Sequence, residues 1–115
     1  MKAVLFHQHG GPEVLRFEET PDPTPAPHEV LIEIRATSVN HLDIFVREGF
    51  PGIKVPLPHI PGADAAGIIR EIGSDVNTIK IGQRVTINPG ICCGRCEFCA
   101  SGFGSQCLTY QMVGE

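Results

Sequence analysis

The sequence predicts a mainly β fold, a small barrel or sandwich with little helix. Short stretches rich in β-branched residues recur along the 115 residues, and turn residues, among them 13 glycines and 10 prolines, separate them. Only residues 41–48 place their apolar side chains at helical spacing. A chain of this length usually forms one domain, and a hydrophobic content of 42% is enough for a modest core.

Two strands joined as a hairpin are expected first. Residues 2–6 (KAVLF) and 13–19 (EVLRFEE) are short and alternating, and the HQHGGP between them is typical of a turn. Four of the seven residues in 21–27 are prolines, which exclude a helix or a central strand. This proline-rich segment should therefore be an extended connector.

A longer strand and a short helix should follow the connector. Residues 29–40 (EVLIEIRATSVN) carry apolar side chains at the even positions from 30 to 36 and mixed ones between them, the pattern of a half-exposed strand. Residues 41–48 (HLDIFVRE) should form the helix. Gly49 is expected to end it as a C-cap.

The next segments predict a loop and two further strands. Residues 50–62 contain four prolines and should be irregular. Residues 63–73 are interpreted as a strand in which Gly67 permits the close approach of another backbone or a ligand. Residues 74–90 should contain a turn and a short strand that is entered through Gly82.

Charge and hydropathy exclude several classes of partner. The net charge is −4 and the lysines and arginines are scattered, so nucleic acid is not an expected partner. The N-terminal apolar run is far too short for a signal peptide, and no run reaches membrane-spanning length, so no membrane is expected either. We expect a cytoplasmic protein. In that reducing compartment clustered cysteines indicate metal ligands before disulfides.

All five cysteines lie within residues 92–107, and four of them follow the pattern C-x2-C-x2-C-x7-C. These four predicted metal ligands are Cys93, Cys96, Cys99 and Cys107. Four thiolates at about 2.3 Å complete a tetrahedral Zn²⁺ site. A closed site of this kind has no vacant position for water or substrate, so the zinc should be structural.

The cysteine lobe, about residues 89–108, needs such a metal because its few apolar side chains cannot offset the entropy lost on ordering it. A structural zinc contributes on the order of 10–16 kcal/mol in small peptides. An iron–sulfur cluster is an alternative, although in the four-iron motif the next cysteine follows after three residues and precedes proline. A redox C-x-x-C pair is a further alternative. Cys92, adjacent to a ligand, is interpreted as a small buried side chain.

Three stretches, together with the cysteine spacing, resemble the N-terminal, GroES-like catalytic domain of the zinc-containing alcohol dehydrogenase superfamily, the medium-chain dehydrogenases and reductases. The stretches are MKAVLFHQHGGPEVLRFEE, EVLIEIRATSVNHLDIFVREG and LPHIPGADAAGIIREIGSDVNTIKIGQRVTINPG. The resemblance implies a partly open β-barrel followed by a Rossmann domain that binds NAD(H) or NADP(H), with hydride transfer in the cleft between them. Residues 1–115 contain no G-x-G-x-x-G after a strand, so the Rossmann domain is absent from them. We expect an incomplete GroES-like domain that ends just after a last candidate strand, residues 109–114.

The departures from this family concern the catalytic metal. The resemblance implies that zinc-dependent members carry a zinc-binding cysteine at the position of Asn40 and a histidine at that of Ala63. An amide and a methyl group cannot replace a thiolate and an imidazole, so the standard catalytic zinc site should not form. The segment around Asn40 instead resembles that of the zinc-free quinone oxidoreductase branch. In that branch an asparagine is followed three residues later by an aspartate, as Asn40 is followed here by Asp43. That branch commonly lacks the cysteine lobe.

Each candidate catalytic or cofactor-binding residue also has a structural interpretation. Asn40 is a candidate donor to an enolate oxygen and equally a helix N-cap. Asp43 lies in the first helical turn, where the macrodipole favours an acid. His41 occupies a position at which the resemblance implies contact with the cofactor, and it is otherwise a partly exposed side chain. Asp64 is either an active-site acid or part of a structural ion pair with a partner such as arginine.

The leading hypothesis is the catalytic-domain part of an NAD(P)H-dependent oxidoreductase that reduces quinones or activated enones and carries one structural zinc. The isolated 115 residues should be inactive, and an exposed strand edge favours a homo-oligomer. One alternative is a zinc-dependent alcohol dehydrogenase with unusual catalytic ligands such as His41 and Asp64. Another is a non-catalytic, zinc-stabilised β-domain that binds a partner or assembles.

Overall fold

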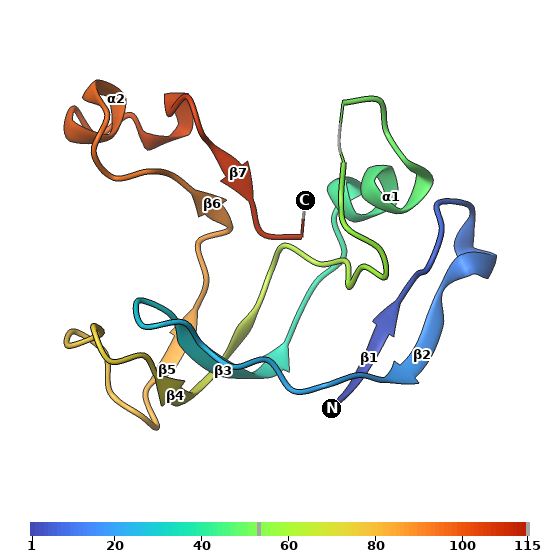
Figure 1. The fold of residues 1–115 in the computed structure, drawn as a ribbon, viewed down its shortest axis with the longest axis horizontal. Helices are drawn as coiled ribbons and strands as arrows, with labels where there is room; N and C mark the ends of the chain where they lie inside the picture. Colours follow the sequence, from blue (N-terminus) through green and yellow to red (C-terminus); the bar gives the residue numbers. More distant parts are fainter. Residues whose placement is uncertain (53, 115) are drawn as a thin grey trace.

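The computed structural model, which describes residues 1–52 and 54–114, confirms the mainly β prediction (Figure 1). The strands are β1 (Lys2–Leu5), β2 (Arg16–Glu19), β3 (Val30–Ala36), β4 (Ala66–Ile72), β5 (Arg84–Thr86), β6 (Gly90–Ile91) and β7 (Gln111–Met112). The helical segments are η1 (Pro12–Val14), α1 (His41–Glu48), α2 (Glu97–Ala100) and η2 (Gly104–Gln106). The strands form three antiparallel sheets, β1-β2, β3-β4-β5 and β6-β7, and these do not close into a barrel within the described residues. No helix in this part of the chain has both the length and the apolar character needed to cross a bilayer.

The N-terminal hairpin forms as predicted, with Lys2 opposite Glu19 and Leu5 opposite Arg16. Its second strand begins later than expected because the residues just before it form the 3-10 turn η1. Proline suits the first position of such a turn, since its φ is already helical and its missing N–H would have no partner there. The turn also brings Val14 into the interior.

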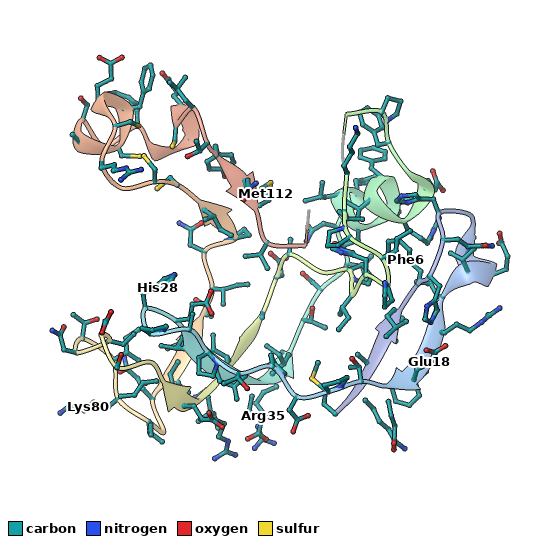
Figure 2. All side chains as sticks on the ribbon, viewed as in Figure 1. Phe6, Glu18, His28, Arg35, Lys80 and Met112 are labelled. Carbon is teal, nitrogen blue, oxygen red and sulfur yellow. The ribbon has the colours of Figure 1, made fainter. Side chains whose placement is uncertain are left out.

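The core of the chain lies between this hairpin and α1. Phe6 and Val46 are fully buried, and Val14 completes the cluster. A short backbone bridge joins Phe6 to His59 through two hydrogen bonds of 3.0 and 2.9 Å. Figure 2 shows Phe6 among the side chains that fill this corner of the molecule. The bridge fixes the irregular 54–62 segment against the hairpin and therefore beside α1.

Both ends of α1 lie where the sequence predicts them. Asn40 is the N-cap, and its backbone N–H donates to the Asp43 carboxylate at 2.7 Å. Gly49 adopts a φ of +83°, a left-handed conformation that glycine accepts without a steric cost. His9 Nδ1 lies 3.0 Å from the Val46 carbonyl oxygen. Because a carbonyl only accepts, Nδ1 carries the proton, and the ring satisfies a carbonyl at the end of the helix.

The three-stranded sheet places β4 in its centre. Gly67 pairs with Ile34, and a Cβ at Gly67 would lie 2.2 Å from the Glu33 carbonyl oxygen, so the predicted close approach of two backbones is confirmed. Ile69 is buried, whereas Ile34 remains 52% exposed. β3 is therefore less buried than its alternating pattern predicts. Among the described elements, only β4 makes extensive contacts with it.

The cysteine lobe projects from the rest of the chain (Figure 1, orange to red) on a stem formed by β6 and β7. The candidate strand at residues 109–114 is confirmed only at Gln111–Met112, which form β7, while its partner β6 and the helix α2 were not predicted. Several apolar side chains of the lobe are largely exposed, namely Ile91, Phe103 and Leu108. Cys92 is exposed as well, so its interpretation as a buried side chain was wrong.

Candidate functional site

The four predicted ligand cysteines converge in the lobe, where sulfur atoms gather at the upper left of Figure 2. Their Sγ atoms all lie within 4.8 Å of one another. The Cys96 and Cys99 sulfurs are 3.5 Å apart, and those of Cys93 and Cys99 are 3.9 Å apart. Four thiolates around one zinc at about 2.3 Å have sulfurs about 3.8 Å from each other. The donor set and its spacing therefore fit a single tetrahedral zinc.

Local backbone geometry directs these sulfurs inward. Gly94 adopts a φ of +71° between the first two ligands, and the Cys96 backbone N–H donates to Cys93 Sγ at 3.3 Å. α2 carries Cys99, and the Cys93 N–H donates to Cys107 Sγ at 3.4 Å. Such N–H to sulfur bonds stabilise thiolates, the form that binds metal. The loop is thus shaped around a centre that holds negative charge.

The pKa values of the thiols reflect this arrangement. The Cys93 backbone N–H, with help from the Thr109 hydroxyl, lowers the pKa of Cys107 to about 6. Backbone N–H groups, first that of Arg95, lower the pKa of Cys93. Loss of hydration raises the pKa of Cys99 to about 12. A divalent cation would replace the missing solvation of the crowded sulfurs and favour four thiolates over a mixture of thiols and thiolates.

The alternatives for this centre fit less well. A four-iron cluster lies between its cysteines and requires sulfurs further apart than the 4.8 Å found here. Cys92 does not belong to the group of converging sulfurs. The converging group therefore consists of four of the five cysteines, the set that the spacing predicted.

A second polar cluster lies where β3 leads into α1. We call it the Asp64 cluster; its members are Thr37, Ser38, Asn40 and Asp64. The Thr37 hydroxyl donates to the Asp64 carbonyl oxygen at 2.8 Å. Ser38 Oγ and Asn40 Nδ2 both donate to Asp64 Oδ2, at 2.5 and 3.0 Å. The structure therefore brings two predicted site residues, Asn40 and Asp64, into direct contact.

Asp64 is ionised at neutral pH. The Ser38 hydroxyl, and after it the Asn40 amide, hold the pKa of this carboxyl below its ordinary value of 3.8. Its partners are thus a hydroxyl and an amide, rather than the arginine that the sequence suggested. Ser38 was not among the predicted residues; the available signal was its position two residues before Asn40 in residues 29–40, which the sequence predicted to be an alternating strand.

The other predicted residues lie at the edge of this cluster. Asp43 uses Oδ2 to bind the Asn40 N–H, while its buried Oδ1 has no partner in the described residues. His41 is exposed, with its ring 6.3 Å from that of Phe45. Ala63, at 3% exposure, contributes only a buried methyl group. Within residues 1–52 and 54–114 only the four cysteines bring three or more ligand atoms together, and His41 and Asp64 belong to no such group there.

Two clefts of about 310 Å³ flank the Asp64 cluster. One is lined by Ser38, Asp64 and residues of β4 and of the segment after β5. The other lies between the hairpin and α1 and has a largely apolar lining that includes Val39 and Ile44, to which Asp43 and Arg47 add charged groups. A small, mostly apolar molecule with one polar group matches such a surface.

Known proteins resemble the chain over nearly its whole length. Residues 26–115 match the family described as alcohol dehydrogenase GroES-like domain. An alcohol dehydrogenase of Schizosaccharomyces pombe is 37% identical over 113 residues, which are 97% of this chain and 32% of that protein. The crystal structure of an NAD-dependent alcohol dehydrogenase superposes with a TM-score of 0.94 and 45% identity, covering 100% of this chain and 34% of the other. Escherichia coli quinone oxidoreductase, in complex with NADPH, superposes with a TM-score of 0.70 and 40% identity, covering 75% of this chain and 26% of the other. The chain spans about a third of the length of the curated relatives it matches.

Proposed function

The chain belongs to the alcohol dehydrogenase GroES-like domain family, and from this premise we propose that it is the substrate-binding part of a medium-chain oxidoreductase with one structural zinc. We propose further that the whole protein reduces quinones or activated enones. The observation that carries this proposal is the chemistry at positions 40 and 63: an amide bound to the Asp64 carboxylate and a buried methyl group occupy the positions at which the resemblance implies a zinc-binding thiolate and imidazole. The complex of a quinone oxidoreductase relative with NADPH supports it.

Zinc in this proposal is held by the four converging cysteines and stabilises the lobe. Four thiolates leave the ion no free position, so it cannot polarise a carbonyl or activate water. The lobe lacks a buried apolar cluster of its own in the described residues. The metal therefore supplies the cohesion that side-chain burial supplies elsewhere in the chain.

Reduction in this proposal takes place beside α1. Reduced nicotinamide, when bound mainly by the remainder of the protein, would supply a hydride to the β-carbon of a conjugated carbonyl. The Asn40 amide donates a hydrogen bond to the carbonyl oxygen, where the added electron pair places negative charge, and solvent supplies the proton that completes the reduction. Asp43 holds the Asn40 backbone at the start of α1. His41, exposed in the first turn, is assigned to contact with the cofactor.

An alcohol dehydrogenase is the second candidate, because the NAD-dependent alcohol dehydrogenase structure covers 100% of this chain and the quinone oxidoreductase structure covers 75%. Metal content and substrate range separate the two. The purified protein at its natural length should contain one zinc per chain and oxidise NADH or NADPH in the presence of a quinone or an α,β-unsaturated ketone. Two zincs per chain, with oxidation of a primary or secondary alcohol by NAD⁺ or NADP⁺, would establish the second candidate. If neither combination of cofactor and substrate is turned over, a zinc-stabilised binding domain is the remaining hypothesis. The size of the purified protein in solution tests the expected homo-oligomer.

A further inference from the structure

Three polar side chains between β3 and α1 all donate hydrogen bonds to one residue, Asp64. Ser38 and Asn40 both donate to Oδ2 of Asp64, and Thr37 donates to its backbone carbonyl. Val39, between Ser38 and Asn40 in the sequence, is 82% exposed. Asp64 is thus the shared acceptor of a segment that has no regular structure of its own.

The chemistry of a carboxylate decides how the Asn40 amide is turned. An ionised carboxylate offers acceptors only, so the group of Asn40 that faces Asp64 is the NH2 group and not the oxygen. One N–H is used at 3.0 Å, and no other hydrogen bond among the described residues involves Nδ2. The second N–H diverges from the first in the amide plane. It is therefore free to donate to another acceptor.

We propose that Asp64 is a positioning residue for Asn40: it accepts one N–H of the amide and thereby presents the second N–H to the carbonyl oxygen of the substrate. This inference rests on the proposed function, in which Asn40 contacts the substrate. Ser38 holds the Asp64 carboxylate in place through its hydroxyl. The lowered pKa of Asp64 supports this role, because a group that stays ionised is a constant acceptor and a poor proton donor at neutral pH.

The same contacts would also serve as a simple tether between the β3–α1 segment and residue 64. The two roles differ in what the Asn40→Asp/Asp64→Asn double variant restores. In that variant the new asparagine at position 64 donates to the new aspartate at position 40, so the hydrogen bond survives with its direction reversed. Position 40 then offers only acceptors. A tether is rescued by this exchange, whereas a donor aimed at the substrate is not.

The experiment measures kcat, KM and Tm of the full-length protein with a quinone substrate. Asp64→Ala should lower kcat about tenfold with little change in KM, since loss of a single oriented donor to a developing oxyanion costs this much or more. Asp64→Asn should keep most of kcat, because its amide oxygen still accepts. The double variant should recover the wild-type Tm while kcat stays about tenfold low. Asp75→Asn is the matched control, because Asp75 also accepts from a serine, Ser74, at 2.9 Å, far from the cluster.

Recovery of kcat by the double variant would overturn the inference, and so would an Asp64→Ala protein as active as the control. If Asp64→Ala does not fold, Asp64→Asn and the double variant still decide between the two roles. A wild-type protein without reductase activity would refute the proposed function instead. In that case the side-chain amide signals of Asn40, followed by NMR on ¹⁵N-asparagine-labelled protein, test the hydrogen bond itself. They should shift and exchange faster in Asp64→Ala, which removes the acceptor, than in the control, and unchanged signals would overturn the inference.

Discussion

Replacing Cys99 by serine should release the zinc and unfold the cysteine lobe while the rest of the chain stays folded. Cys99 lies within 3.5 Å of one ligand sulfur and 3.9 Å of another, so its loss opens the tetrahedron. The two parts of the chain should respond differently because their sources of stability differ. The hairpin and α1 share a core around Phe6 and Val46, and the lobe has no member in it.

The size of the expected loss of stability in the lobe follows from how little of its apolar surface is buried. A fully buried large apolar side chain contributes about 1.5–3 kcal/mol. Ile91, Phe103 and Leu108 are 49%, 58% and 86% exposed, so each contributes only a fraction of that. A structural zinc contributes on the order of 10–16 kcal/mol in small peptides, which is comparable with the roughly 5–15 kcal/mol that stabilises a typical domain. Without the metal, burial alone cannot keep the lobe ordered.

Hydrogen exchange followed by mass spectrometry, together with the zinc content of the protein, tests this reasoning. In Cys99→Ser the amides of residues 92–108 should lose nearly all protection, whereas those around Phe6 should keep theirs. Cys92→Ser is the matched control, because Cys92 lies outside the group of converging sulfurs and should retain one zinc and full protection. A zinc-free Cys99→Ser protein with a protected lobe would show that side-chain packing, and not the metal, holds it.

Three further predictions concern pH, the core and the sheet. Donors lower the pKa of the Cys107 thiol from 9.0 to about 6, so the stability its thiolate contributes is complete above pH 9 and is lost as the pH falls through about 6. Below that pH zinc binding must displace one more proton, so the apparent zinc affinity, measured by competition with a chromogenic chelator, should fall more steeply below about pH 6 than above it, and an unchanged slope would contradict this. Phe6→Ala should cost about 3–5 kcal/mol in denaturant unfolding, because Phe6 is fully buried, and a cost below about 1 kcal/mol would mean that the core collapses around the gap. Gly67→Ala should destabilise the protein by at least about 2 kcal/mol, since its Cβ would lie 2.2 Å from the Glu33 carbonyl oxygen; an unchanged thermal midpoint would show that β3 moves aside freely.

Much of the fold could be predicted because its signals are local. α1 begins and ends at residues whose backbone preferences specify a boundary, with Gly49 at a left-handed φ as its stop. The four ligand cysteines are separated by short spacers, so the reach of the chain already brings their sulfurs together. Gly67 marked the close approach of β3 and β4, because only a residue without a side chain fits there.

The remaining features depend on contacts between distant segments. The stem of the lobe pairs two-residue strands, too short to carry a pattern of their own. His9 binds the end of α1 across 37 residues, and nothing in the composition of its loop indicates that contact. The partner of Asp64 was expected to be an arginine, yet a hydroxyl and an amide fill that place.

By itself the sequence determined which residues could bind a metal, where the helix α1 ends, and that no thiolate or imidazole stands at positions 40 and 63. These are matters of residue type, short spacing and backbone conformation. Only the tertiary structure decided that Asn40 and Asp64, 24 residues apart, share a hydrogen bond, and that Ser38 joins them. The register of β3 against β4 sets which side chains meet at the end of the sheet, and register is a property of the paired strands rather than of either segment alone.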